Sequence, residues 1–294
     1  MKALNNETKG IIYIILSGFL YGFLGFFGVK AMESSSGDIA NMLFWRFLIA
    51  SSFILLVMLP KLKEMKVDLS AMLAILIGSA IFYGSSTLAF FASSTHIGTG
   101  LAMVIFFTYP AIVVLCNRFF YKHQVSNVYY ISVVLILLGL ILLADIGDHF
   151  NYLGILLGLI SAAGYAFYIM TSKKYNQLHP LLSTLLVSIG CAIFCLMIAL
   201  YGKTFTVPQD PAFWLNGLGL GIIATAVPIL LLLKGLQYIS SAKASILGVL
   251  EPVFVVIFGV LLLGEEIKVL QALGVAIILG GALLALVARQ TAAE

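Results

Sequence analysis

Charged residues are scarce in this sequence of 294 residues, in which they make up 10% of the chain. Soluble globular proteins carry about 25% charged residues, so this composition excludes an ordinary water-soluble domain. Cysteine is scarcer still, with three residues, no CxxC pair and no histidine–cysteine spacing typical of a metal site. We therefore expect no metal and no cofactor, and we interpret the cysteines as small residues of the core.

Catalytic motifs are also missing. The sequence has no HExxH, no GxSxG and no Walker motif, and only one carboxylate lies in the middle of an apolar run. These absences argue against a membrane-embedded enzyme, and they disfavour an ATP-driven pump unless a partner chain supplies the nucleotide-binding domain. The net charge of +4 is small, and nothing in it indicates a nucleic-acid partner.

Long apolar runs dominate instead, and 62% of the residues are hydrophobic. A helix that spans a bilayer needs about 20 apolar residues. The sequence predicts ten such spans, at residues 10–30, 39–60, 69–93, 97–118, 126–145, 151–173, 180–201, 214–237, 242–263 and 268–288. Apolar residues do not alternate with polar ones, which excludes a transmembrane barrel. We therefore predict an all-α integral membrane protein of ten transmembrane helices, with the lipid bilayer as its surroundings.

Basic residues predict the orientation of these spans. With a cytoplasmic N-terminus, eleven lysines and arginines fall in cytoplasmic segments and three fall outside. The cytoplasmic set is Lys2, Lys9, Lys61, Lys63, Lys66, Arg118, Lys122, Lys173, Lys174, Lys243 and Arg289, and the outer set is Lys30, Lys203 and Lys268. Such an excess follows the positive-inside rule. Both termini are therefore predicted to be cytoplasmic.

The two halves of the chain resemble each other. At a spacing of 144, the residues Gly10, Ser17, Tyr21 and Lys30 match Gly154, Ser161, Tyr165 and Lys174, and at a spacing of 142 the residues Ala102, Pro110 and Gly139 match Ala244, Pro252 and Gly281. We predict one repeat at residues 10–145 and a second at 151–288, each with five spans. Because five is odd, the second repeat enters the membrane from the opposite side, as in many secondary transporters.

The pair Glu251-Pro252 lies near the middle of the ninth span. An ionisable side chain at that depth costs roughly 2.5 kcal/mol or more, and the proline leaves the carbonyl of Gly248 without its helical donor. Hydrocarbon-like surroundings favour a neutral carboxyl group, so Glu251 is a candidate to exchange a proton or to bind the amino group of a substrate. With Pro110 in the fourth span, Pro252 and Gly248 are the predicted hinge. The competing interpretation is a packing defect.

Arg46 and four tyrosines are the other candidate site residues. Arg46 lies about seven residues into the second span, roughly 10 Å from the outer surface, where it either binds a substrate carboxylate or extends to the interface. Tyr21 and Tyr165 are equivalent in the two repeats, and with Tyr83 and Tyr109 they form the rest of the predicted cavity wall. Helix packing is the alternative for these tyrosines.

These features carry a family resemblance. The two five-helix repeats, Arg46 in the second span and the stretch from Ala242 through Glu251-Pro252 to Leu263-Gly264-Glu265 resemble an EamA-type member of the drug/metabolite transporter superfamily. The resemblance implies a carrier of the bacterial inner membrane that moves small metabolites, often exporting amino acids, through a cavity between the repeats. Tyr109 stands where the second repeat has Glu251, so a two-fold-symmetric pair of sites is not expected.

We therefore expect a secondary transporter that exports amino acids or related metabolites by alternating access, with protons as a candidate coupling ion. An uptake or exchange carrier for a larger metabolite such as S-adenosylmethionine is one alternative, and a passive channel or membrane scaffold is another. The glycine pattern Gly18-xxx-Gly22 leaves both a monomer and a homodimer open.

Overall fold

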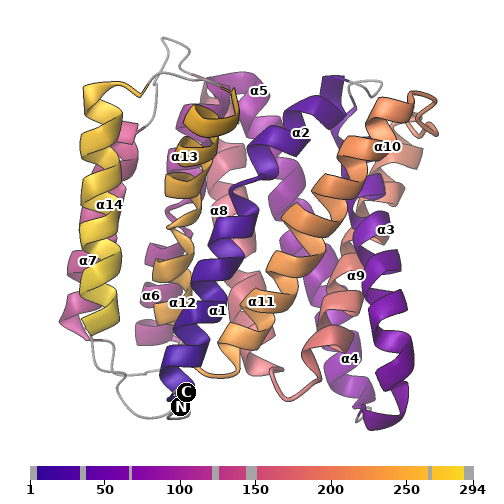
Figure 1. The fold of residues 1–294 in the computed structure, drawn as a ribbon, viewed down its shortest axis with the longest axis horizontal. Coiled ribbons are helices and arrows are strands. Elements are labelled where there is room, and N and C mark those ends of the chain that lie inside the picture. Colours follow the sequence, from indigo (N-terminus) through magenta and orange to yellow (C-terminus); the bar gives the residue numbers. More distant parts are fainter. Residues whose placement is uncertain are drawn as a thin grey trace.

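The computed structural model describes residues 5–33, 38–65, 68–120, 126–143, 151–263 and 267–287, and these residues contain helices and connections but no strand. Figure 1 shows the helices as one upright bundle. Gly264 and Glu265, which end the stretch that carries the family resemblance, lie outside the described residues. So do residues 144–145 and 288, which end the two predicted repeats.

The helices follow one another with short connections. Those of the first half are α1 (Asn6–Tyr21), α2 (Leu24–Glu33), α3 (Ile39–Met58), the 3₁₀-helix η1 (Leu59–Glu64), α4 (Leu69–Gly78), the π-helix η2 (Ser79–Gly84), α5 (Ser85–Phe106), α6 (Tyr109–Phe119) and α7 (Asn127–Leu143). Those of the second half are α8 (Tyr152–Lys174), α9 (Pro180–Tyr201), α10 (Pro211–Leu218), the π-helix η3 (Gly219–Ala226), α11 (Val227–Leu236), α12 (Ser241–Gly248), α13 (Glu251–Leu263) and α14 (Val269–Val287).

Among the described residues, eight helical stretches are long and apolar enough to cross a bilayer, and α7 is a shorter apolar helix. One stretch, Leu69–Phe119, has 51 residues. A straight helix of that length would measure about 75 Å, more than twice the hydrocarbon thickness. Gly98 interrupts it with φ 76° and ψ 153°, torsions that favour glycine. Large apolar side chains such as Leu56, Leu138 and Leu261 are exposed on the outside of the bundle, where they suit lipid.

Seven of the described helices start at a side chain that accepts a hydrogen bond from the first turn, as expected for N-caps. The capping residues are Asp38, Asp68, Ser126, Asn151, His179, Asp210 and Ser240. At Asp68, the bonds from the Ser70 hydroxyl and from the Ala71 and Ser70 amides hold the pKa of the carboxyl group below its usual value. These caps fix the residue at which each of these helices begins.

At the two prolines of the predicted hinge, the structure has a break in the helix. The fourth predicted span is interrupted at residues 107–108, and the ninth at residues 249–250. Pro110 and Pro252 each occupy the second position of the helix that follows the break, where a missing amide hydrogen leaves no helical carbonyl unpaired. The first predicted span is also broken, between Tyr21 at the end of α1 and Leu24 at the start of α2.

Helices from the two halves pack against each other at equivalent positions. The hydroxyl of Ser17 donates to the carbonyl of Pro228, and that of Ser161 donates to the carbonyl of Ser86, each over 2.8 Å. The serines are 144 positions apart and the acceptors 142. The two π-helices also end 142 positions apart, at Gly84 and Ala226. The contacts across the bundle therefore follow the spacing of the sequence repeat.

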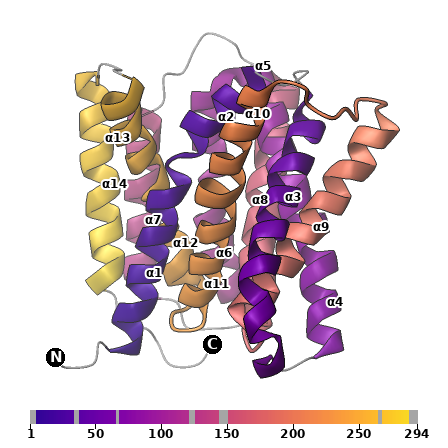
Figure 2. The ribbon, with the colours of Figure 1, turned by 45° about the vertical axis from the view of Figure 1, so that its right-hand side comes forward.

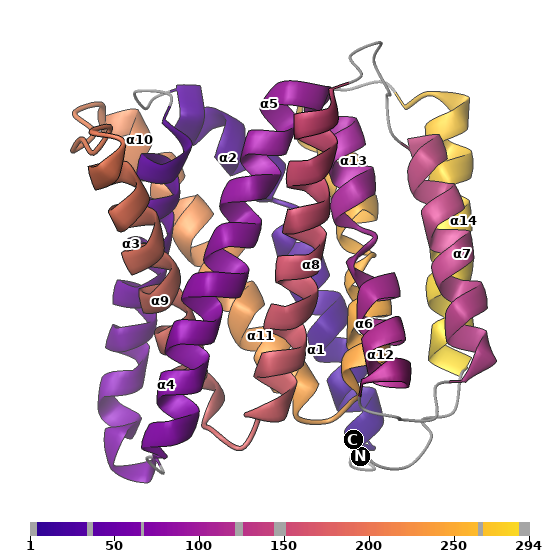
Figure 3. The same ribbon diagram turned by 180° about the vertical axis from the view of Figure 1, so that it is seen from behind.

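The helices α7 and α14 form a pair at one side of the bundle, while α3, α4 and α9 lie at the other side (Figures 1, 2 and 3). Glycines allow the pair to approach closely. A Cβ atom at Gly139 would lie 2.7 Å from the carbonyl oxygen of Gly274 and 2.7 Å from Cγ1 of Ile278. The backbones of the two helices are therefore in direct contact, as small residues permit in membranes.

This contact generates a prediction. Gly139→Ala places a methyl group against backbone that cannot rotate away, so we expect it to lower the free energy of unfolding by about 1–3 kcal/mol. Gly280→Ala, on α14, is the matched control, because a Cβ there meets no atom within 4 Å. The measurement is thermal unfolding of the purified protein in detergent. Equal stability of the two variants would contradict the close packing of α7 on α14.

Candidate functional site

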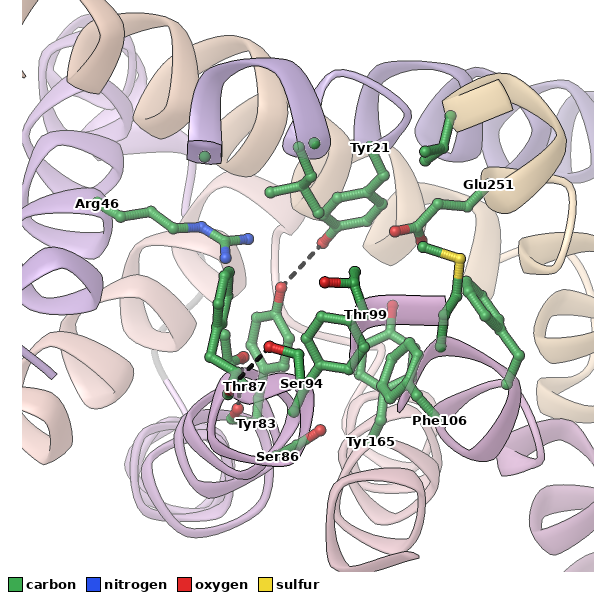
Figure 4. A pocket seen from close by; sticks show the side chains of 18 residues that line it. Tyr21, Arg46, Tyr83, Ser86, Thr87, Ser94, Thr99, Phe106, Tyr165 and Glu251 are labelled. Carbon is green, nitrogen blue, oxygen red and sulfur yellow. Dashed lines mark hydrogen bonds between the residues drawn. The ribbon is translucent and has the colours of Figure 1, made fainter. Parts of the chain in front are cut away.

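A cavity of about 220 Å³ lies between the helix breaks, and α1, α2, α3, η2, α5, α8 and α13 all contribute to its wall. Most of the lining is apolar, from side chains such as Phe90, Met103 and Phe106. Polar groups converge on it from Thr87 and Ser94 of α5 (Figure 4). An apolar cavity with a few directed polar groups is the usual form of a small-molecule site.

Glu251 reaches the cavity because the helix break places it at the first position of α13. Gly18 of α1 packs against this break, since a Cβ there would be in ordinary van der Waals contact, 3.5 Å from the amide nitrogen of Glu251. The amide groups of a first helical turn attract negative charge. The carboxyl group points into the cavity, and within the described chain it has no ion pair or hydrogen bond (Figure 4).

Arg46 approaches from the opposite wall (Figure 4). Its side chain is 3% exposed, so it does not extend to the lipid interface, which was the alternative left open by the sequence. Its Nε donates to the hydroxyl of Thr225 over 2.6 Å, and its guanidinium lies 5.1 Å from the centre of the Phe47 ring. Thr225 belongs to η3 and donates in turn to the carbonyl of Leu220. The remaining guanidinium nitrogens face the cavity, where a guanidinium binds carboxylates through paired hydrogen bonds.

The predicted tyrosines pack against one another, and Tyr21, Tyr83 and Tyr165 line the cavity that Arg46 and Glu251 share. The hydroxyl groups of Tyr21 and Tyr83 are 3.3 Å apart, and the ring of Tyr165 lies 4.7 Å from that of Tyr109, edge to face. Sequence reasoning did not single out Tyr168, which is buried behind the cavity wall and supports it by stacking on Tyr83 with ring centres 4.6 Å apart. Its position three residues after Tyr165, on the same helix face, is the signal that could have identified it.

Tyr109 lies beneath the cavity and not on its wall. It lines a second, much smaller pocket of about 10 Å³, together with Gly248, Tyr21, Tyr165 and Glu251. Its hydroxyl donates to the carbonyl of Ser245 over 3.1 Å. A Cβ at Gly248 would lie 2.6 Å from this hydroxyl, so the predicted hinge glycine allows the tyrosine to approach α12. A space of that size holds about one water molecule.

The end of the bundle below Tyr109 is closed by polar contacts. Asn117 of α6 donates to the Ser241 hydroxyl of α12 over 2.9 Å. Lys243 of α12 pairs with Glu7 of α1 at 2.6 Å and donates to the carbonyl of Leu286 at 3.2 Å. The sequence assigns Lys243 to a cytoplasmic segment, yet its side chain is fully buried. The α1 start and α14 end therefore meet at this closed end.

The other end of the cavity extends toward Gly28 of α2 and Thr99, next to the Gly98 turn. Helix α2 lies at the end of the bundle away from the start of α1 (Figure 1). The described residues contain no group of three or more histidine, cysteine, aspartate or glutamate side chains suited to a metal ion. What the cavity offers is one acid and one guanidinium on facing walls, an arrangement that suits a dipolar molecule.

The bond between Arg46 and Thr225 generates a prediction. Thr225→Val keeps the shape of the side chain but leaves a buried guanidinium donor unpaired, so we expect a loss of about 1–3 kcal/mol in the free energy of unfolding. Thr225→Ser keeps the hydroxyl and should retain most of the stability. Thermal unfolding in detergent measures both. A Val variant as stable as the Ser variant would show that this bond does not hold Arg46.

The model of the EamA-like transporter family matches the chain twice, over residues 8–144 and 152–287. The chain is 24% identical to an uncharacterized transporter, YxxF, of Bacillus subtilis over 97% of this chain and 91% of the relative. It is 26% identical to an uncharacterized transporter of Archaeoglobus fulgidus over 71% of this chain and 75% of the relative. It is 27% identical to the threonine/homoserine exporter RhtA of Escherichia coli over 69% of each chain.

One solved crystal structure superposes with a TM-score of 0.77 over 94% of this chain and 96% of that chain. The sequences are 16% identical, so this likeness shows the fold alone. The matches to transporters point to transport and not to an enzyme, and they imply a small-molecule substrate and a bilayer. The chain therefore belongs to the EamA-like transporter family, within the drug/metabolite transporter superfamily, and is a multi-pass protein of the inner membrane.

Proposed function

We propose that the protein is a secondary transporter that exports amino acids or closely related zwitterions by alternating access. The observation that carries this proposal is the placement of Arg46 and Glu251 on facing walls of one apolar cavity (Figure 4). The guanidinium binds the substrate carboxylate, and the ionised carboxyl group of Glu251 binds the ammonium group. Tyr21, Tyr83 and Tyr165 lie between them, near the middle of the bound molecule.

Alternating access follows from two inverted five-helix repeats. Separating the two sides of Gly98 and including α7 brings the eight apolar stretches to ten spans, which supports the 5+5 arrangement. The two family matches, over residues 8–144 and 152–287, support repeats close to those predicted from the sequence. The paired serine bonds at spacings of 142 and 144 support the pseudo-two-fold relation.

The distribution of basic residues supports cytoplasmic termini. With that orientation, the end closed by Asn117, Ser241 and the Lys243–Glu7 pair faces the cytoplasm, and the cavity opens outward. The structure then represents an outward-open state. This is the state in which an exporter releases its substrate.

The cavity size supports a small substrate. Its volume of about 220 Å³ is below the roughly 300–1,000 Å³ of pockets for drug-sized ligands. This favours a free amino acid over a nucleoside-containing metabolite such as S-adenosylmethionine. The relative named as a threonine/homoserine exporter supports both the substrate class and the direction of transport.

The test begins with a thermal-shift screen of the purified protein against amino acids, with threonine and homoserine included. The best ligand is then compared with its deaminated analogue, which keeps only the carboxylate, and its decarboxylated analogue, which keeps only the amine. We expect Glu251→Gln to weaken the binding of the amino acid by tenfold or more, and to leave the affinity for the deaminated analogue unchanged. Arg46→Gln should weaken the binding of the ligands that carry a carboxylate and leave the affinity for the decarboxylated amine unchanged.

Asp210→Asn is the matched control, because it makes the same carboxyl-to-amide change at an exposed residue outside the cavity, where asparagine can still accept from the Ala212 amide. It should keep the affinities of the unmodified protein. If Glu251→Gln lowered the affinity for both analogues equally, Glu251 would act through packing and not by binding the ammonium group. A screen in which no amino acid stabilises the protein would contradict the proposed substrate class.

A further inference from the structure

The two helix breaks carry equivalent residues in different bonding states. Positions 142 apart relate Tyr109 to Glu251 and Ser245 to Met103. Tyr109 is the first residue of α6, and it donates to the carbonyl of Ser245 in α12. Glu251 is the first residue of α13 and lines the open cavity together with Met103 of α5. At the closed end, the Tyr109 hydroxyl is hydrogen-bonded to the carbonyl of Ser245. At the open end, the equivalent pair is Glu251 and Met103, and the corresponding hydrogen bond is not formed.

The backbone at each break matches this difference. In the ninth span, the amide of Val249 bonds to Ile246, three residues back, which leaves the carbonyl of Ser245 available to the Tyr109 hydroxyl. In the fourth span, the equivalent amide of Phe107 bonds to Met103, four residues back, over 2.9 Å. The bond made by this amide thus differs between the two breaks. In the fourth span it occupies the carbonyl of Met103, which is the equivalent of the Ser245 carbonyl that accepts from Tyr109.

We propose that proton binding to Glu251 closes the outer end of the cavity, because the protonated carboxyl group donates to the carbonyl of Met103 as Tyr109 donates to Ser245 here. This inference rests on the alternating access of the proposed function. If the halves exchange conformations, Glu251 takes the place of Tyr109. A tyrosine hydroxyl always has a hydrogen to donate, whereas an ionised carboxylate only accepts. Two facing acceptors repel each other, so the outer end closes only after proton uptake.

The groups around Glu251 are compatible with this role. Tyr21 of α1, Tyr109 of α6 and Tyr165 of α8 line the small pocket with it. Phenols ordinarily ionise near pH 10, so these groups remain neutral donors while Glu251 titrates. Arg46 of α3 is the charged group across the larger cavity, with Tyr83 of η2 beside it. In the described part of the chain, α2 and α5 add no titratable side chain to the cavity wall.

Proton–substrate antiport follows from this arrangement. Ionised Glu251 holds the ammonium group of the substrate, and a proton arriving from the outside replaces it. The protonated carboxyl group then bonds to Met103 and the empty carrier turns inward, where the proton leaves and a new substrate binds. One proton enters for each substrate exported. Glu251 in the second repeat corresponds to Tyr109 in the first. Closure of the outer end therefore depends on pH, whereas closure of the cytoplasmic end does not.

The test uses a single reporter cysteine in a variant with Cys116, Cys191 and Cys195 replaced. Ser94→Cys lies on the cavity wall, and Gln209→Cys, exposed in the loop before α10, is the reference for the intrinsic effect of pH on thiol reactivity. The measurement is the labelling rate with a polar maleimide in nanodiscs at pH 5.5 and pH 8, expressed as the ratio of the two sites. If the cysteine-free chain does not fold, the three buried cysteines are kept and labelling without a reporter is subtracted.

We expect the ratio to fall at least threefold from pH 8 to pH 5.5 with Glu251 intact. Glu251→Gln, whose amide donates at every pH, should give the low ratio at both pH values. Glu251→Ala, which cannot donate, should give the high ratio at both. The inference would be overturned if the labelling ratio did not change with pH in the protein that keeps Glu251. It would also be overturned if Glu251→Gln gave a high ratio at pH 8. Amino-acid binding measured on the same samples tests the proposed function separately, so either can fail without the other.

Discussion

Backbone amide and carbonyl groups inside a bilayer have no water to bond with, so a spanning chain can leave the helical conformation only where protein or a cavity surrounds it. This protein does so near the middle of three predicted spans, between Tyr21 and Leu24, at residues 107–108 and at residues 249–250. The breaks meet around one cavity. They place Tyr21 at a helix end and Glu251 at a helix start, and the site depends on them.

The two halves share their architecture and differ in chemistry. Both have a proline just after the break and a π-helix that ends at an equivalent position. The π-helices carry Tyr83 in one half and Thr225, at the spacing of 142, in the other. Thr225 orients Arg46, while Tyr83 bonds to Tyr21. Similar backbones thus present a guanidinium, an acid and tyrosines asymmetrically to one cavity, and a dipolar substrate of the kind proposed above would bind there in a single orientation.

Much of this could be predicted from the sequence, because polar and charged residues are easily recognised within long apolar runs. The apolar runs predict an all-helical membrane protein, and the sparse polar residues within them predict Arg46, Glu251 and the tyrosines as candidates. Helix breaks in place of kinks could not be predicted, since a proline is compatible with both. The hydrogen-bond partner of Arg46 could not be predicted either. Thr225 lies 179 positions away, and no sequence pattern distinguishes it from other threonines in apolar runs. The burial of Lys243 depends on Glu7, which lies 236 positions away in the sequence.

Substrate counterflow tests the central claim, a carrier with one amino-acid site that alternates between the two sides of the membrane. Proteoliposomes are loaded with an excess of the amino acid that stabilises the protein most, and a trace of the labelled compound is added outside. The account predicts transient accumulation of label above equilibrium, which Glu251→Gln abolishes and Asp210→Asn retains. Equilibration of the label without stimulation by internal substrate would indicate a channel and would contradict the account.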